Sequence, residues 1–315
     1  ARGAPTPCPG PRDGAGEPMK PHDVDAARRE TLERALAEDA PHGDVTGEAY
    51  VPADAVSRVA VTAREAGVCS GLDVLAEVFA LVDPAVEVLP RTADGRAVAA
   101  GTVLAEVRGP ARAVLRGERV ALNLLQRMCA IATTTAAHVE AVRAAGADAR
   151  VTDTRKTAPG LRVFDRQAVR DGGGHNHRRG LSDAVMLKDN HWAAMGLADA
   201  DGTLTASDAE VTAALRAVRA RLPHTVHIEV EVDRLEQIPP VLAAGVDTIM
   251  LDNFSLADLR AGVELIGGRA LVEASGGVTL ETIGPIAATG VDIVSVGALT
   301  HSVRALDIGF DAVAA

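Results

Sequence analysis

The second half of the 315-residue chain alternates between short β-rich segments and helical patterns. Strands are predicted at 149–153, 184–187, 225–232, 248–251, 270–273 and 292–296, and the last four end about 22 residues apart. This rhythm is typical of successive βα units that build a parallel sheet. It restricts the chain to an open doubly wound sheet or a closed barrel, because both folds share it.

Polar residues or glycine stand where these strands finish: Lys188, Glu231, Asp252, Ser275 and Gly297. Barrel enzymes assemble their active sites from loops at this edge. The placement therefore favours a barrel over an open sheet, and it predicts that the active site lies at this edge.

The first part of the chain has a different pattern. Helices are predicted at 24–39 and 71–82, a turn at EDAPHGDVT, and strands at 57–64, 86–89 and 102–108. They predict a small mixed α/β domain of residues 19–122, followed by the barrel domain at 123–298. From Glu118 a long helical run is expected to form two helices. Residues 1–18 are rich in Pro, Gly and Ala and are expected to form a disordered leader, which makes Met19 a candidate start.

Composition excludes several classes of function. The formal net charge is −11 and aromatic residues make up 2% of the chain, which disfavours nucleic-acid binding through phosphates or base stacking. Cys8, Cys69 and Cys129 lack the spacing of a disulfide framework or a zinc site. No apolar run is long enough to span a bilayer, and the start lacks a signal-peptide core. We therefore expect a cytoplasmic protein with no membrane partner.

Cationic side chains gather in one segment against this acidic background. Three sequences, TRKTAPGLR, GGGHNHRRGL and LKDNH, contain the cationic or potentially cationic residues Arg155, Lys156, Arg162, His177, Arg178 and Lys188, and the first two also contain glycines. Arginine grips carboxylates and phosphates with a planar fork, whereas lysine is a mobile point charge, so the mixture suits a ligand that carries both groups. We expect a pocket for a polyanionic small molecule.

The spacing of His175 and His177 also suggests metal ligands or, as His-Asn-His, a nuclease. No third ligand with suitable spacing is evident, and Arg178 and Arg179 would repel a cation. We therefore expect His177 to donate a hydrogen bond to a carboxylate.

In the segment HIEVEVDR polar and apolar residues alternate strictly, which places on one face of a strand His227, Glu229, Glu231 and Asp233. An exposed edge strand would explain this pattern without any function. Inside a barrel, however, inward carboxylates need lysines, arginines or a metal. We expect Lys188 and Mg²⁺ to meet that need, with Glu231 and Asp252 as oxygen ligands of the metal.

Two glycine-containing turns close the last two predicted strands, Ser275-Gly276-Gly277 and Val296-Gly297-Ala298. Their backbone amides are accessible, and barrels commonly bind phosphate at this position. Each tripeptide alone is a common turn, but the paired placement predicts a phosphate cradle.

Taken together, these motifs closely resemble the quinolinate phosphoribosyltransferase family. The likeness runs from about residue 24 to residue 307, through EDAPHGDVT, ERVALNLLQRMCAIATTT, DTRKTAPGLR, GGGHNHRRGLSDAVMLKDNH, IEVEVD, IMLDN, EASGG and DIVSVGALTHSV. The resemblance implies a sandwich-like mixed α/β domain, rejoined by residues 299–315, and an incomplete α/β barrel of the seven-stranded type. It also implies a homodimer in which each active site borrows residues from the neighbouring subunit.

The resemblance implies transfer of the phosphoribosyl group of phosphoribosyl pyrophosphate to quinolinate, with Mg²⁺ as cofactor. The products would be nicotinate mononucleotide, pyrophosphate and CO₂, in de novo NAD biosynthesis. The catalytic positions it implies are Lys156, Lys188, Glu231 and Asp252, of which Glu231 and Asp252 would hold the metal. The substrate contacts it implies are Thr154, Arg155, Arg162, His177, Arg178, Lys188 and, across the dimer, Arg119. The phosphate loops would be Ser275, Gly276 and Gly277 with Val296, Gly297 and Ala298.

Two alternatives stay open at this point. One is a homologue of the same fold that acts on nicotinate or another heterocycle, or that serves molybdenum uptake. The other is a non-catalytic protein that binds pyridine carboxylates. Release of CO₂ from labelled quinolinate would distinguish the quinolinate activity from the first alternative. Binding without turnover would support the second alternative.

Overall fold

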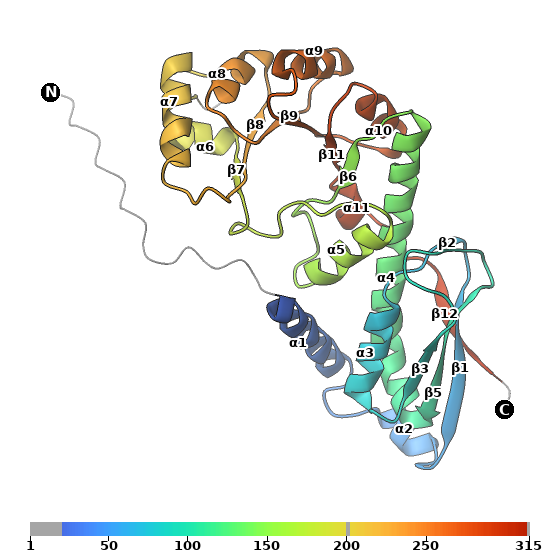
Figure 1. The fold of residues 1–315 in the computed structure, drawn as a ribbon. Coiled ribbons are helices and arrows are strands. Elements are labelled where there is room, and N and C mark those ends of the chain that lie inside the picture. Colours follow the sequence, from blue (N-terminus) through green and yellow to red (C-terminus); the bar gives the residue numbers. More distant parts are fainter. Residues whose placement is uncertain (1–20, 200–201, 314–315) are drawn as a thin grey trace.

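The computed structural model describes residues 21–199 and 202–313. The predicted leader at 1–18 and Met19 lie outside these residues. Two main sheets organise the structure, a small antiparallel one and a larger parallel one, and a long helix, α4 (Ala111–Ala144), runs from one to the other (Figure 1). Among the described residues, no helix is both long and apolar enough to cross a membrane.

The small sheet is antiparallel, with the order β12-β1-β5-β3. Its strands are β1 (Val56–Ala63), β3 (Glu87–Pro90), β5 (Val103–Pro110) and β12 (Ile308–Ala312), and a separate ribbon joins β2 (Gly67–Val68) to β4 (Ala97–Val98). The strands predicted at 57–64, 86–89 and 102–108 are confirmed within two residues. Because β12 pairs with β1, the C-terminal strand completes the first sheet.

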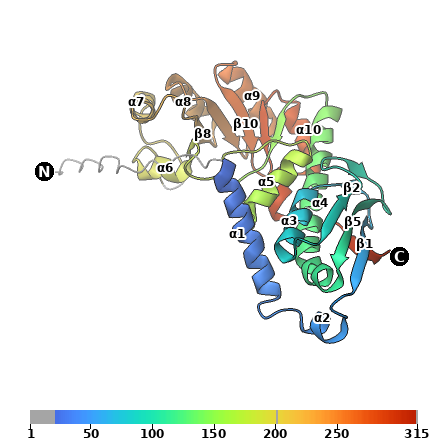
Figure 2. The same ribbon diagram turned by 60° about the horizontal axis from the view of Figure 1, so that its bottom comes forward.

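Two predicted helices pack in this part of the structure. They are α1 (Pro21–Asp39) and α3 (Leu72–Val82), and Figure 2 shows α1 alongside α3 and α4. The fully buried side chains of Leu75 and Phe79 in α3 belong to one core with Leu104 and Val107 of β5. An apolar helix face therefore covers the sheet.

The segment EDAPHGDVT makes the predicted turn, but a helix that we did not predict follows it. This is α2 (Val45–Tyr50), and Asp44 caps its start by accepting a hydrogen bond from Thr46 N at 3.1 Å. The signal was present in the sequence, because aspartate is a preferred N-cap residue.

The prediction of two helices from Glu118 onward was wrong, because α4 is one continuous helix. The run of three threonines at 133–135 lies inside the helix, and two of its hydroxyls bond back to the carbonyls one turn earlier. Thr133 Oγ1 donates to Cys129 O at 2.6 Å, and Thr135 Oγ1 donates to Ile131 O at 2.7 Å. The expected domain boundary at 122/123 falls inside this helix, so α4 belongs to both parts.

The larger sheet is fully parallel, with the order β6-β11-β10-β9-β8-β7. Its strands are β6 (Arg150–Thr152), β7 (Val185–Leu187), β8 (Ile228–Val232), β9 (Thr248–Asp252), β10 (Leu271–Ser275) and β11 (Ile293–Ser295). The first of them pairs with the last, so the sheet curves into a barrel. On the free side of β6, His175 makes a single bridge with Thr152, which stands in the place of a seventh strand. The predicted incomplete barrel is confirmed.

Helices follow the barrel strands along the chain. They are α5 (Arg162–Asp171), α6 (Asp189–Ala194), α7 (Asp208–Arg219), α8 (Ile238–Ala243) after a short 3₁₀ turn (Leu235–Gln237), α9 (Leu256–Ile266), α10 (Leu280–Ala287) and α11 (Ala298–His301). Ser207 and Ser255 cap α7 and α9 through their side chains, and Gly267 ends α9 in the left-handed conformation. Parallel pairing brings the ends of neighbouring strands together, as in the register of Ser275 with Asp252. The predicted polar strand ends therefore share one edge.

Candidate active site

A cavity of about 390 Å³ lies at the edge of the barrel where the strands end. All six strands, or the loops that follow them, contribute to its wall. It is lined by Thr154, Arg155, Lys156, His177, Arg178, Met186, Lys188, Glu231, Met250, Asp252, Glu273, Ser275 and Ser295. Most of the predicted site residues are thus brought together from segments far apart in the sequence.

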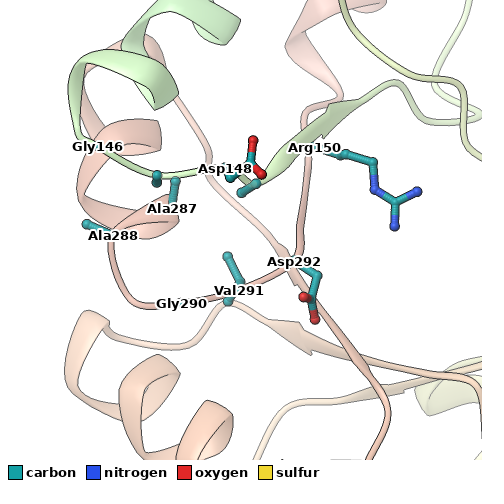
Figure 3. Close-up of a pocket in the computed structure, with 10 residues that line it drawn as sticks. Gly146, Asp148, Arg150, Ala287, Ala288, Gly290, Val291 and Asp292 are labelled. Atoms are coloured by element: carbon teal, nitrogen blue, oxygen red, sulfur yellow. The ribbon is translucent and has the colours of Figure 1, made fainter. Parts of the chain in front are cut away.

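The opposite edge of the barrel holds another cavity, of about 450 Å³, where β6 and β11 begin (Figure 3). Its wall consists mainly of small residues such as Gly146 and Ala288, and the Arg150 side chain points away from the alanines in Figure 3. Asp292 is already engaged, since its Oδ2 accepts a hydrogen bond from Val272 N at 2.8 Å. This cavity offers few convergent polar groups, so we place the candidate site at the strand ends.

Carboxylates occupy the ends of β8 and β9. Glu231 contacts the ammonium group of Lys188, the pairing expected from the sequence, and its carbonyl accepts a hydrogen bond from Trp192 Nε1 at 3.3 Å. Burial raises the pKa of Glu231, Lys188 partly offsets that effect, and the nearby charge of Asp252 adds to it. The two carboxylates therefore repel each other and favour a cation between them.

Cations occupy the loops on the other side of the cavity. Arg155 and Lys156 follow β6, where both side chains are exposed, and Thr300 Oγ1 fixes the loop by donating to Lys156 O at 2.7 Å. Arg178 is anchored by its NH1 group, which donates to Ala184 O at 3.1 Å. Burial, followed by the charge of Arg155, lowers the pKa of Arg178. An anion bound between the two arginines would relieve this repulsion.

His177 lies at the floor of the cavity. Its Nε2 atom is 3.2 Å from Glu229 Oε2 and 3.4 Å from Glu273 Oε2, and its Nδ1 atom accepts a hydrogen bond from Arg178 N at 2.7 Å. Burial disfavours the charged ring, but the two glutamates outweigh burial and raise the pKa of His177 to about 10. Both ring nitrogens already have protein partners, and the carboxylates that His177 faces belong to the protein.

Two of the predicted substrate contacts do not line the cavity. Arg162 instead binds the loops that do, since its Nε donates to Thr157 Oγ1 at 3.0 Å and its NH1 to Arg179 O at 3.0 Å. Arg119 lies on α4 with an exposed side chain. Its predicted contact with quinolinate across a dimer stays a prediction.

The predicted phosphate loops lie beside the cavity, and of their six residues only Ser275 is among its lining residues. At Gly297 an added Cβ would lie 3.0 Å from Lys156 Cδ and 3.1 Å from His301 Nε2. An added Cβ at Gly297 would therefore press against the side chains of Lys156 and His301, which both approach the loop. We did not predict His301 as a site residue, although it follows Gly297 by only four positions.

Asp153 is a further residue that we did not predict. It is fully buried, and its carboxylate accepts hydrogen bonds from His177 N at 2.7 Å and from Asn176 Nδ2 at 2.6 Å. Burial raises its pKa even though Arg166 and these donors favour the charged form. Asp153 thus holds the segment that carries His177 and Arg178. Its place at the end of the predicted strand 149–153 was the feature of the sequence that could have identified it.

The fold and the cavity define the class of this protein, an α/β-barrel enzyme whose cavity sets arginines and lysines beside a pair of carboxylates. Comparison with known proteins gives the particular family. Residues 44–129 match the quinolinate phosphoribosyl transferase N-terminal domain, and residues 131–311 match the quinolinate phosphoribosyl transferase C-terminal domain. The chain belongs to the quinolinate phosphoribosyltransferase family.

Individual relatives support the same assignment. The chain is 46% identical over 293 residues to the nicotinate-nucleotide pyrophosphorylase [carboxylating] of Mycobacterium leprae, covering 90% of this chain and 97% of that protein. It is 40% identical over 284 residues to the probable nicotinate-nucleotide pyrophosphorylase [carboxylating] of Bacillus subtilis, covering 90% and 92%. The crystal structure of NadC from Streptococcus pyogenes superposes with a TM-score of 0.82 at 41% identity, covering 94% of this chain and 98% of that one.

Proposed function

We propose that this protein transfers the phosphoribosyl group of phosphoribosyl pyrophosphate to quinolinate and decarboxylates the product to nicotinate mononucleotide, releasing pyrophosphate and CO₂ in NAD biosynthesis. The observation that carries the proposal is the division of the cavity wall into a cationic side with Arg155, Lys156 and Arg178 and an acidic side with Glu231 and Asp252. Quinolinate and pyrophosphate need the first side, and the reacting sugar needs the second.

Quinolinate carries two carboxylates, and the two cavity arginines suit them. Burial, followed by the charge of Arg155, lowers the pKa of Arg178, so a dianion placed between the two arginines gains from both charges. Arg162 acts one step away by binding the backbone carbonyl of Arg179, the residue after Arg178. Their shared effect is to hold the pyridine nitrogen towards the sugar.

Ribosyl transfer develops positive charge on the sugar while pyrophosphate departs. Lys156 would stabilise the leaving phosphates, and Ser275 of the first predicted phosphate loop lines the same cavity. Glu231 and Asp252 lie where they stabilise the cationic sugar. Once the ring nitrogen is bonded to the ribosyl group, the ring is a positively charged pyridinium. The nitrogen then draws electrons from the adjacent carbon and so promotes loss of the neighbouring carboxylate.

The carboxylates also fit a magnesium ion. Glu231 and Asp252 are oxygen donors at adjacent strand ends, and the charge of Asp252 contributes to the raised pKa of Glu231, so the pair gains from a hard cation. Glu231 and Asp252 would hold Mg²⁺ together with phosphate oxygens of the substrate. The ion would supply charge neutralisation for the departing pyrophosphate.

A homodimer with shared active sites completes the proposal. Arg119 is exposed on α4, and the apolar side chain of Leu115, one turn earlier on the same face, is 47% exposed. Tyr50 of α2 is 86% exposed, and Arg112 joins α2 to α4 by donating to Val51 O at 2.9 Å. Exposed apolar groups around a cation fit a surface that a second copy covers.

The buried free thiols of Cys69 and Cys129 suit a reducing cytoplasm.

The direct test is an assay of the purified protein with quinolinate, phosphoribosyl pyrophosphate and Mg²⁺. We expect nicotinate mononucleotide, pyrophosphate and CO₂ in equal amounts, and we expect a chelator of divalent cations to stop the reaction. Nicotinate serves as the comparison substrate. Failure to release CO₂ from quinolinate, or faster turnover of nicotinate, would contradict the proposal.

A further inference from the structure

The loop of residues 153–161 carries Lys156 to the catalytic cavity. Lys156 lines that cavity and is exposed. An added Cβ at Gly297 would lie 3.0 Å from Lys156 Cδ, so the lysine side chain passes close to the second predicted phosphate loop. Lysine is a point charge on a flexible stem. The position of its ammonium group therefore depends on how firmly the backbone of the loop is held.

Two fully buried residues hold this loop from neighbouring helices. Thr300, in α11, donates a hydrogen bond from Oγ1 to Lys156 O at 2.7 Å. Asp165, in α5, accepts a hydrogen bond from the backbone of Ala158. The loop is thus fixed at Lys156 and again two residues later.

Arg127 of α4 binds both of these residues. Its Nε and NH2 groups donate to Asp165 Oδ1 and Oδ2, each at 2.8 Å, and NH2 also donates to Thr300 O at 2.9 Å. The planar fork of an arginine can bind a carboxylate in two places and still reach a carbonyl. One guanidinium group therefore holds α5 and α11 in a single arrangement and, through them, the loop of Lys156.

We propose that Arg127 is a positioning residue, which aims Lys156 at the departing pyrophosphate. The inference rests on the proposed function, in which Lys156 stabilises that leaving group. Arg127 is not among the described residues that line the catalytic cavity, so it acts through Asp165 and Thr300 rather than on the substrate. Misplacing a catalytic group by about 1 Å can cost about 100-fold in rate. Because Lys156 would act on charge that develops as pyrophosphate leaves, the loss should appear in kcat.

The test combines Arg127→Met with Lys156→Ala. Methionine keeps an unbranched apolar stem but removes the fork. Steady-state pyrophosphate release by the purified full-length protein gives kcat, and varying each substrate gives the two KM values. We expect Arg127→Met alone to lower kcat by about 10-fold to 100-fold, with the KM for quinolinate within about threefold of the wild-type value. In the Lys156→Ala background the same change should lower kcat by less than about threefold, because no ammonium group remains to be positioned.

Arg219→Met is the matched control. Arg219 also joins an aspartate to a backbone carbonyl, since its NH2 group lies 2.6 Å from Asp247 Oδ2 and donates to Gly245 O at 3.2 Å. Those two residues precede β9, at the edge of the barrel where the strands begin and away from the catalytic cavity. We expect kcat of this variant to stay within about twofold of the wild-type value. A loss as large as that of Arg127→Met would show general loosening of the barrel and overturn the inference.

Thr300→Val covers the case in which Arg127→Met does not fold, because removing one partner of a buried ion pair is strongly destabilising. Valine keeps the shape of Thr300 and the carbonyl that Arg127 binds, and it removes only the hydroxyl that donates to Lys156 O. Thermal unfolding reports which variants fold. We expect Thr300→Val to lower kcat about threefold to tenfold in the wild-type protein and by less than about twofold in Lys156→Ala.

Two results would contradict the positioning role. One is an equal loss of kcat with and without Lys156. The other is an unchanged kcat in Arg127→Met, or in Thr300→Val where Arg127→Met does not fold. A wild-type protein that releases no pyrophosphate with quinolinate would instead refute the proposed function.

Discussion

Two adjacent glycines in one predicted phosphate loop allow a sharp test of the geometry. Gly276 has φ +95°, and an added Cβ would lie 2.1 Å from Asn253 Oδ1 and 2.8 Å from Asn253 N. Gly277 has φ +58°, and an added Cβ would meet no atom within 4 Å. The same change to alanine therefore strains the backbone at both positions but produces a clash at only one.

The magnitudes follow from these contacts. Alanine in the left-handed conformation at Gly277 should cost about 1–2 kcal/mol of the free energy of unfolding. Gly276→Ala should cost about 2–5 kcal/mol, because overlap with a backbone atom adds roughly 1–3 kcal/mol to the conformational strain. Asn253 itself has φ +58° and donates a hydrogen bond from Nδ2 to Asp252 Oδ2 at 2.6 Å. Moving Asn253 therefore disturbs Asp252.

Urea unfolding of the two variants and the wild-type protein measures the difference, and steady-state kinetics report its effect on the site. We expect Gly276→Ala to lower kcat/KM for phosphoribosyl pyrophosphate by about tenfold or more, equivalent to about 1.4 kcal/mol. Equal losses of stability in the two variants would refute the reasoning, since only one added methyl group meets the backbone of Asn253.

The other predictions concern charge. Arg155→Ala or Arg178→Ala should raise the KM for quinolinate about 10-fold to 100-fold while the far-UV circular dichroism spectrum is unchanged, and near-normal kinetics in both variants would remove the carboxylate clamp. Mixed Arg119→Ala and Lys188→Ala subunits should recover activity through hybrid dimers, and no recovery after confirmed subunit exchange would count against a shared site. The buried glutamates raise the pKa of His177 from 6.5 to about 10, so the stability that it contributes is full below about pH 6.5 and is lost as the pH rises through 10. Urea unfolding between pH 6 and pH 10 should therefore show a steeper loss of stability in the wild-type protein than in His177→Asn, and parallel curves would contradict the assignment.

Much of the barrel could be predicted because its signals are local. Parallel strands place their ends at one edge, so residues such as Glu231 and Asp252 that follow successive β-rich segments had to meet. The strict alternation in HIEVEVDR also indicated that carboxylates face inward and need a cation, and Lys188 contacts Glu231 as expected. The missed helix α2 begins at the Asp44 cap, a side-chain bond to the backbone that a pattern of apolar residues does not contain.

The partners of His177 could not be predicted, for a different reason. Glu229 and Glu273 come from β8 and β10, which are separated in the sheet by β9. Their meeting depends on how the strands of the curved sheet are staggered, and no local spacing in the sequence records that. The sequence shows no partner for His177 nearby in the chain, whereas the barrel interior supplies the carboxylates of Glu229 and Glu273.

The distribution of charge around the barrel links binding to chemistry. The loops next to its open side, after β6 and before β7, carry Arg155, Lys156 and Arg178, while the carboxylates follow β8 and β9. Scattered charges of both signs would neutralise one another as ion pairs, but here the two groups are separated, apart from the contact of Lys188 with Glu231. Burial lowers the pKa of Arg178 and the charge of Arg155 adds to this effect, while burial raises the pKa of Glu231 and the charge of Asp252 adds to that one. A ligand with anionic groups and a centre that becomes positive during reaction relieves both sides at once. The attraction between the carboxylates and the sugar grows only as positive charge develops on the sugar. It therefore stabilises the transition state more than the bound substrate.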